Sequence, residues 1–302
     1  MDLNQLTRHV VYGGVDYTYL RPGITLCLIY AEPAQTLAPA VADILEAYID
    51  FIPADSLQTY LAANGTWKKA TKRTFNSTLK ELRGIGPGEY AEFHFGQEPL
   101  SHVGQFGAHL SASPLDDDFY PLDTNILYLE FPADLSTFTS SDALIEFIHK
   151  IAQCKKFDSG FCGYAFNHLH LSFRNEVFKE IGKLALRFTG LDICNYRIRK
   201  AARGRVCNVS WLNLFGPEIT QKLGGPAKIR EALPADMTVE EWGDSVMVKA
   251  SEEPIIGDVN RGAEDAEPLR HLAQLTRELR LDVPNLGPDD DDFAQRWLAR
   301  FD

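Results

Sequence analysis

Residues 206–225, VCNVSWLNLFGPEITQKLGG, open the most distinctive part of this 302-residue sequence, which continues through SVMVKA (245–250) to IIGDVNRG (255–262). Trp, Gly and Pro are concentrated here, and the glycines stand at the ends of periodic segments. Glycine in such places is typical of backbone that turns with a positive φ or approaches a neighbouring segment closely. We therefore expect tight turns here that join short strands to helices.

Apolar periodicity elsewhere predicts both strands and helices. The run GITLCLIYA (23–31) has the composition of a buried strand, and a helix is expected to follow from about Thr36. The segments EYAEFHFG (89–96) and GQFGAHLSA (104–112) alternate as the two strands of a hairpin do. Further strands are expected at 125–131 and 160–173, and further helices at 141–151, 177–188, 269–279 and from about Asp290.

This mixture lacks the strict alternation of a parallel α/β fold. It favours an α+β fold with an antiparallel or mixed sheet and with helices packed on one side. We predict a single α+β domain over residues 1–302. The halves 1–156 and 157–302 both run from a strand through a helix to further strands, so a pair of related modules is a hypothesis, although no sequence repeat is visible.

Charge is unevenly distributed along the chain. The formal net charge is −12, with 42 Asp and Glu against 30 Lys and Arg. Residues 89–170 carry a net charge of −9 and residues 231–302 one of −11, whereas residues 171–230 carry +8. This balance disfavours nonspecific binding to nucleic acid and favours a basic partner. The blocks also predict a polarised surface.

Nothing in the sequence predicts export or insertion into a membrane. The start, MDLNQLTRHV, has no continuous apolar core, and the longest apolar run, 23–31, is too short to span a bilayer. The five cysteines are odd in number and form no CxxC pair, which is typical of reduced thiols in a protein core. We therefore expect a cytoplasmic protein.

The common catalytic motifs are missing, and histidines provide one alternative. The sequence has no GxSxG, GxxxxGKS/T or HExxH pattern. His168 and His170 alternate on a predicted strand, so both rings would point to one face, where His94 and His109 could complete a metal site. No carboxylate or cysteine stands at a recognisable ligand spacing. We predict no enzyme, metal or cofactor, and keep a metal-dependent hydrolase or nucleic-acid-processing enzyme using His168 and His170 as the alternative.

Two runs of aspartate are the candidate binding surfaces. One run, 116–118, lies in a loop between two predicted strands. The other, 289–292, precedes the last amphipathic helix, where capping and the helix dipole account for one or two carboxylates but not for four. The predicted partner-binding residues are Asp116, Asp117, Asp118, Asp289, Asp290, Asp291 and Asp292.

Other polar stretches receive weaker interpretations. The basic residues between 60 and 88 are interpreted as a solvated helix face. The connector YRIRKAARGR (196–205) leaves a third alternative, an adaptor that contacts nucleic acid. In GDVNRG, Asp258 and Asn260 offer too few oxygens for calcium, so we expect an Asx turn there.

The stretch quoted first also supports a family resemblance. WLNLFGPEITQKLGG, then SVMVKASEEPIIGDVNRG, then a helix with leucines at 269, 272 and 279, resembles the type VI secretion immunity family associated with VRR-NUC-type nuclease effectors. The likeness covers most of the chain in layout and is most specific over 206–281. The residues that match the family pattern are Trp211, Gly224, Gly225, Gly257, Asp258 and Asn260.

The resemblance implies an immunity protein, kept in the cytoplasm of the toxin producer and its sister cells, that binds an injected effector. It implies no catalytic residue. The matching residues are expected to be mainly structural, with interface roles for Asp258 and Asn260 left open. The expected partner is a basic effector domain, a nuclease, whose active-site surface the acidic loops occlude. Whether inhibition blocks or distorts the active site stays open, as does the stoichiometry.

Overall fold

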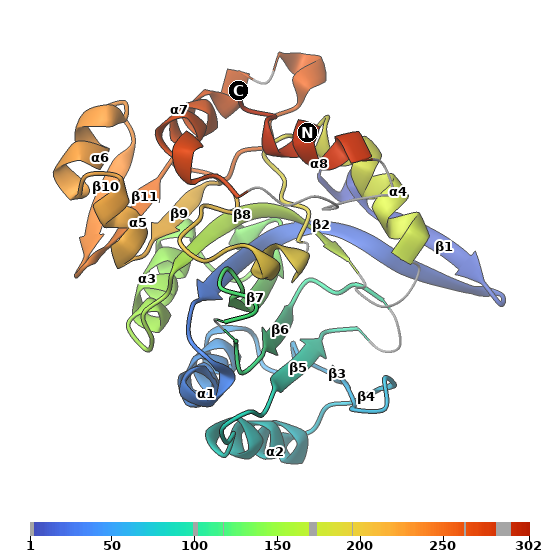
Figure 1. Cartoon of the computed structure of the whole chain (residues 1–302). Helices are drawn as coiled ribbons and strands as arrows, with labels where there is room; N and C mark the ends of the chain where they lie inside the picture. Colours follow the sequence, from blue (N-terminus) through green and yellow to red (C-terminus); the bar gives the residue numbers. More distant parts are fainter. Residues whose placement is uncertain are drawn as a thin grey trace.

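The computed structural model describes residues 3–98, 102–116, 118–168, 174–194, 196–262, 264–281 and 291–302. Within these residues, eleven strands form one antiparallel sheet, and helices pack on both of its faces (Figure 1). The strand order is β10-β11-β9-β8-β2-β7-β6-β5-β3-β4, and β1 pairs with β2 outside this path. The sheet therefore passes without interruption from one half of the chain to the other, through the pair β2–β8.

The strands of the described chain have the following bounds: β1 (Arg8–Tyr12), β2 (Val15–Tyr30), β3 (Thr59–Leu61), β4 (Trp67–Lys69), β5 (Ala91–Gly96), β6 (Gly107–Ala112), β7 (Asn125–Pro132), β8 (Ser159–His168), β9 (Leu212–Phe215), β10 (Thr238–Trp242) and β11 (Ser245–Lys249). The α-helices are α1 (Ala34–Phe51), α2 (Lys72–Arg83), α3 (Ser141–Ala152), α4 (Arg174–Ala185), α5 (Pro217–Lys222), α6 (Pro226–Ala232), α7 (Glu267–Leu275) and α8 (Asp291–Leu298).

Strand β2 is the centre of the sheet because it is apolar on both faces. It pairs with β7 from Gly23 to Tyr30 and with β8 from Leu20 to Ile29. Successive side chains of a strand point to opposite faces, so a strand buried on both sides reads as a continuous apolar run. This explains why the sequence 23–31 shows no alternation.

The two faces of the sheet carry separate hydrophobic clusters. On one face, α1, α2 and α3 cover Ile24, Leu26 and Leu28 of β2. On the other face, α4 and α8 cover Cys27 and Ile29 of the same strand. The predicted α+β class and the antiparallel sheet are confirmed, but the expected placement of the helices on one side is corrected, because both faces of β2 require cover.

A third cluster belongs to the stretch 206–262 and the helix that follows it. Here β9 and β11 pack against α5, α6 and α7, with Phe215, Ile219, Ile229, Val248 and Leu269 among the buried side chains. This stretch therefore builds one end of the sheet together with the helices that cover it (Figure 1).

Most other expected elements are present with shifted ends. The predicted hairpin partners become β5 and β6, and Ser140 caps α3 through its side chain, which accepts a hydrogen bond from the main-chain N–H of Ala143. Helix α4 ends at Ala185, before the expected end at residue 188. The sequence analysis missed β1 and the short strands β3 and β4. Among the free cysteines, four are buried as expected, whereas Cys154 is exposed.

Candidate functional site

The loop that joins β6 to β7 combines exposed acidic and aromatic side chains. Within this loop, residues 113–124, the side chains of Phe119 and Tyr120 are 78% and 59% exposed, and that of Leu122 is 47% exposed. Tyr90, which is 71% exposed, precedes β5 at the same end of the sheet, because Ala91 pairs with Ala112 at the end of β6. Exposed aromatic groups beside charge are typical of protein-binding surfaces. We call residues 113–124 the acidic-aromatic loop.

Asp116 shapes this loop, and Asp118 is left exposed on it. The Asp116 carboxylate accepts hydrogen bonds from the main-chain N–H groups of Asp118 (3.2 Å) and Phe119 (3.3 Å). The N–H of Tyr120 donates to the carbonyl oxygen of Asp116 at 2.7 Å. Asp116 is therefore partly a turn-forming residue, whereas Asp118 is exposed to solvent. Asp117 lies outside the described residues.

The basic connector holds the acidic-aromatic loop in place. The N–H of Thr124 donates to the carbonyl oxygen of Arg199 at 2.7 Å, and the N–H of Arg203 donates to that of Leu122 at 3.2 Å. The Lys200 ammonium lies 2.6 Å from the Asp123 carboxylate. It also lies 5.2 Å from the ring centre of Tyr120. The connector thus serves an internal role that its sequence alone did not indicate.

A groove with a volume of about 920 Å³ lies beside this loop. Its lining includes residues of α2, the segment after β3, and β5, together with His109 and Ser111 of β6 and the side chain of Arg199. Burial, with Arg199 nearby, lowers the pKa of His109 to about 4. His109 is therefore neutral at pH 7, and Arg199 supplies positive charge at this end of the groove.

The second aspartate run begins helix α8. Asp291 is the first helical residue, and the Asp292 carboxylate forms an ion pair with Arg296 one turn later, at 3.7 Å. Carboxylates in a first turn interact favourably with the helix dipole. The opposite face of α8 is buried through Phe293 and Trp297. Asp289 and Asp290 lie outside the described residues.

Trp211 and the matching glycines occupy structural positions. Trp211 is 1% exposed, and its indole N–H donates to the carbonyl oxygen of Ser251 at 2.8 Å. Gly224 and Gly225, between α5 and α6, both have φ of +87°. Gly257 has φ of +65° and lies so close to Thr189 that an added Cβ would overlap the Thr189 hydroxyl.

Asp258 is buried and held by an arginine. Its two carboxylate oxygens accept hydrogen bonds from Arg187 at 3.0 and 3.2 Å, and the N–H of Asn260 donates to it at 3.1 Å. The latter contact is the Asx turn that the sequence predicted. Hydrogen bonding to Arg187 lowers the pKa of Asp258. Of the two residues with an open interface role, Asn260 is exposed and Asp258 points inward.

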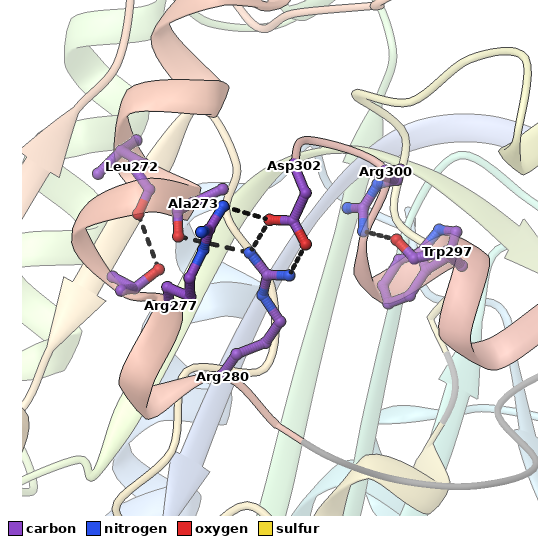
Figure 2. A network of polar contacts seen from close by, with 8 residues as sticks. Leu272, Ala273, Arg277, Arg280, Trp297, Arg300 and Asp302 are labelled. Carbon is purple, nitrogen blue, oxygen red and sulfur yellow. Dashed lines mark hydrogen bonds and ion pairs between the residues drawn. The ribbon is translucent and has the colours of Figure 1, made fainter.

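The end of the chain is fastened by arginines that sequence reasoning did not single out (Figure 2). Arg280 donates to both carboxylate oxygens of Asp302, at 2.7 and 2.8 Å, and Arg277 reaches the same carboxylate at 3.4 Å. Arg300 donates to the carbonyl oxygen of Trp297 at 2.7 Å, and its guanidinium carbon lies 3.9 Å from the centre of that ring. Burial lowers the pKa of Arg300 to about 9. This network joins α8 to the segment after α7.

The histidines of the alternative hypothesis lie in or beside the core. A ring nitrogen of His168 lies 3.3 Å from the carbonyl oxygen of Ile193, and the residue is buried. The rings of His94 and His109 stack with centres 4.9 Å apart. Among the residues that the structure describes, no three His, Cys, Asp or Glu side chains are placed to hold one metal ion. His170 lies outside them.

None of the helices in the described ranges is both long enough and apolar enough to cross a lipid bilayer.

Comparison with known proteins decides the family. The family model TsiV, described as type VI immunity for VRR-NUC, matches residues 40–301. This chain belongs to the TsiV family. The membership confirms the resemblance stated from the sequence, and a family of immunity proteins implies a non-enzymatic role.

A solved structure shows the same fold. The Pseudomonas aeruginosa T6SS protein PA0821 is similar, with a TM-score of 0.81 and 20% sequence identity, over 95% of this chain and 84% of that one. At this identity the similarity concerns the fold alone. No curated protein matches the chain.

Proposed function

We propose that this TsiV protein neutralises a VRR-NUC type VI effector by covering a basic surface of the effector with the acidic-aromatic loop. The observation that carries the proposal is the exposure of Asp118, Phe119 and Tyr120 together on a loop that the connector holds in place. Aromatic side chains supply binding energy at interfaces, and charge steers the encounter. The occluded surface is expected to include the nuclease active site.

The charge of the whole chain supports the same partner. At a net charge of −12, the chain attracts basic domains and repels nucleic acid, so it competes with the nuclease substrate for one surface. The aspartates that begin α8 add a second acidic surface. Binding of an injected effector would occur in the cytoplasm of the producer and its sister cells. The connector alternative is less favoured, because Lys200 is paired with Asp123.

Replacement of Asp116, Asp117 and Asp118 together by Asn tests the loop. Asn keeps a side-chain oxygen that can hold the turn but removes the charge. Association with the effector is expected to slow by about tenfold at low salt and to become less sensitive to salt. Stopped-flow mixing over a salt series measures both quantities.

The matched control is the replacement of Asp50, Asp55 and Asp236 by Asn, because these three residues are exposed on other elements and the change in net charge is the same. The control is expected to slow association less than the loop variant does. Equal rates for the two variants at every salt concentration would exclude the loop from the interface.

A further inference from the structure

The side chain of Arg199 is held in the groove with part of its hydrogen-bonding capacity unused. Its Nε and Nη1 atoms are buried, and no hydrogen-bond acceptor for them lies among the described residues. Its carbonyl oxygen accepts two hydrogen bonds from Thr124, which fixes the backbone at this position. A buried donor without an acceptor is unfavourable, and a carboxylate satisfies a guanidinium best, through two parallel hydrogen bonds.

The acidic residue of the neighbouring strand β5, Glu92, does not serve as the partner of Arg199. Glu92, on β5, lies opposite Ser111 of β6, and both line the groove together with Arg199. Glu92 forms no ion pair with Arg199 in the part of the chain that is described. The guanidinium therefore has no carboxylate partner among the described residues, and Arg199 borders the groove that an outside carboxylate would enter.

The outer edge of β5 forms another wall of the same groove. Strand β3 pairs with β5 only at Thr59–Gly96 and Tyr60–Phe95, so the part of β5 before Phe95 has no strand beside it on that edge within the described residues. The N–H of Gln97 donates to the carbonyl oxygen of Phe106, which immediately precedes β6. Because main-chain groups alternate in direction along a strand, those of Glu92 point away from β6, toward this edge.

An extended segment that pairs with such an edge has a defined side-chain pattern. On the face of Glu92 and Ser111, one of its side chains would reach Arg199. On the opposite face, the groove is lined by apolar groups that include Phe93, Leu61 and Ala62. The fitting occupant therefore alternates acidic and apolar residues, and an exposed strand edge binds such a segment through its main chain.

We infer that the groove receives an extended segment of the effector, which adds a strand to β5 and places an Asp or Glu carboxylate on Arg199. The inference rests on the proposed function, because the occupant belongs to the same effector. The groove, with the positive charge of Arg199, is thus a second recognition element beside the negatively charged acidic-aromatic loop. The effector thus presents a basic surface and, next to it, an acid-bearing strand.

The test uses the full chain and the nuclease effector, with Arg199→Ala, Arg199→Lys and the control Arg73→Ala. Arg73 lines the groove from α2. Arg199→Ala is expected to speed dissociation about 30-fold or more and to leave association within about threefold, because loss of a buried charge partner acts mainly on dissociation. Arg199→Lys should recover part of the loss, and Arg73→Ala should change dissociation less than threefold.

Hydrogen exchange on the unaltered chain supplies a second readout, which does not depend on whether a variant folds. The amide of Glu92 is expected to become protected when the effector binds. Unchanged dissociation for Arg199→Ala together with a Glu92 amide that gains no protection would overturn the groove inference, and the proposed function would still stand if the loop variant slows association. Absence of any complex with the unaltered chain would overturn both.

Discussion

The stretch 206–262 and the acidic-aromatic loop differ in where their side chains lie. In the first, Trp211 and Asp258 are buried and bonded within the chain. In the second, Asp118, Phe119 and Tyr120 face solvent. The most distinctive sequence of the protein thus builds the fold, whereas the plainer loop carries the exposed side chains that we propose as the binding surface.

The difference has a physical cause. Buried positions restrict size and φ, so they require particular residues such as Trp and Gly. An exposed loop needs only a turn and solubility, so many sequences satisfy it. Residues that identify a family need not be those that touch a partner. Substitutions in the two regions should therefore separate stability from binding.

The largest effect on stability is expected from Trp211→Ala. The side chain is 1% exposed, and its removal leaves a cavity and an unsatisfied Ser251 carbonyl. The free energy of unfolding should fall by about 3–5 kcal/mol. Urea denaturation measures the change. Trp211→Phe, which keeps a ring, should lose less, and a loss below about 1 kcal/mol for Trp211→Ala would contradict the structural role of this residue.

A smaller loss is expected from Gly257→Ala. The new Cβ would meet the Thr189 hydroxyl and lie 2.9 Å from the main-chain nitrogen of Gly190, in a backbone with φ of +65°. Strain and overlap together should lower the free energy of unfolding by about 2–4 kcal/mol. Gly13→Ala is the control, since φ is +59° there but no atom lies within 4 Å. It should cost about 1–2 kcal/mol, and equal losses would show that the contact with Thr189 is unimportant.

Asp158 joins the connector to the stretch 206–262, because the N–H of Gly216 donates to its carbonyl oxygen at 3.0 Å, and its burial predicts a pH dependence. It is buried, and its carboxylate accepts a hydrogen bond from the N–H of Gly204 in the connector at 2.7 Å. Burial raises its pKa from 3.8 to about 6. The folded chain therefore holds this proton more tightly than the unfolded chain. The free energy of unfolding should accordingly increase as pH falls from about 6 to 4 and decrease as pH rises over the same range.

The variant Asp158→Asn removes this titration. Relative to the variant, the unaltered chain should gain on the order of 1–2 kcal/mol of unfolding free energy between pH 7 and pH 4.5. Urea denaturation at both pH values provides the comparison, with the exposed Asp50→Asn as control. A constant difference in unfolding free energy between the two chains across this pH range would show that burial does not shift the pKa of Asp158.

The smallest effect on stability is expected in the acidic-aromatic loop. Phe119→Ser and Asp118→Asn change exposed side chains, so the free energy of unfolding should stay within about 0.5 kcal/mol of the original value. Both variants should nevertheless weaken the complex with the effector, which isothermal titration calorimetry measures. A large loss of stability, or unaltered affinity, would remove the contrast between the two regions.

The sequence by itself determined the elements whose pattern is local. Helical spacing predicted α1 and α3, alternation predicted β5 and β6, and the Trp and Gly pattern identified the family. These predictions succeed because the type of each residue reflects the burial and the φ angle at its own position. The same signals failed for β3 and β4, which are too short to show a period.

Only the tertiary structure decided which segments meet. The connector lies against the acidic-aromatic loop, with Lys200 paired to Asp123 and the carbonyl of Arg199 bonded to Thr124, across 75 residues or more. Likewise, Arg187 of the basic block neutralises Asp258 of the acidic one. Charge counts along a chain do not include such pairs, because the pairing depends on strand order. For the same reason, the groove at Arg199 and the helices on both faces of β2 became visible only in the fold.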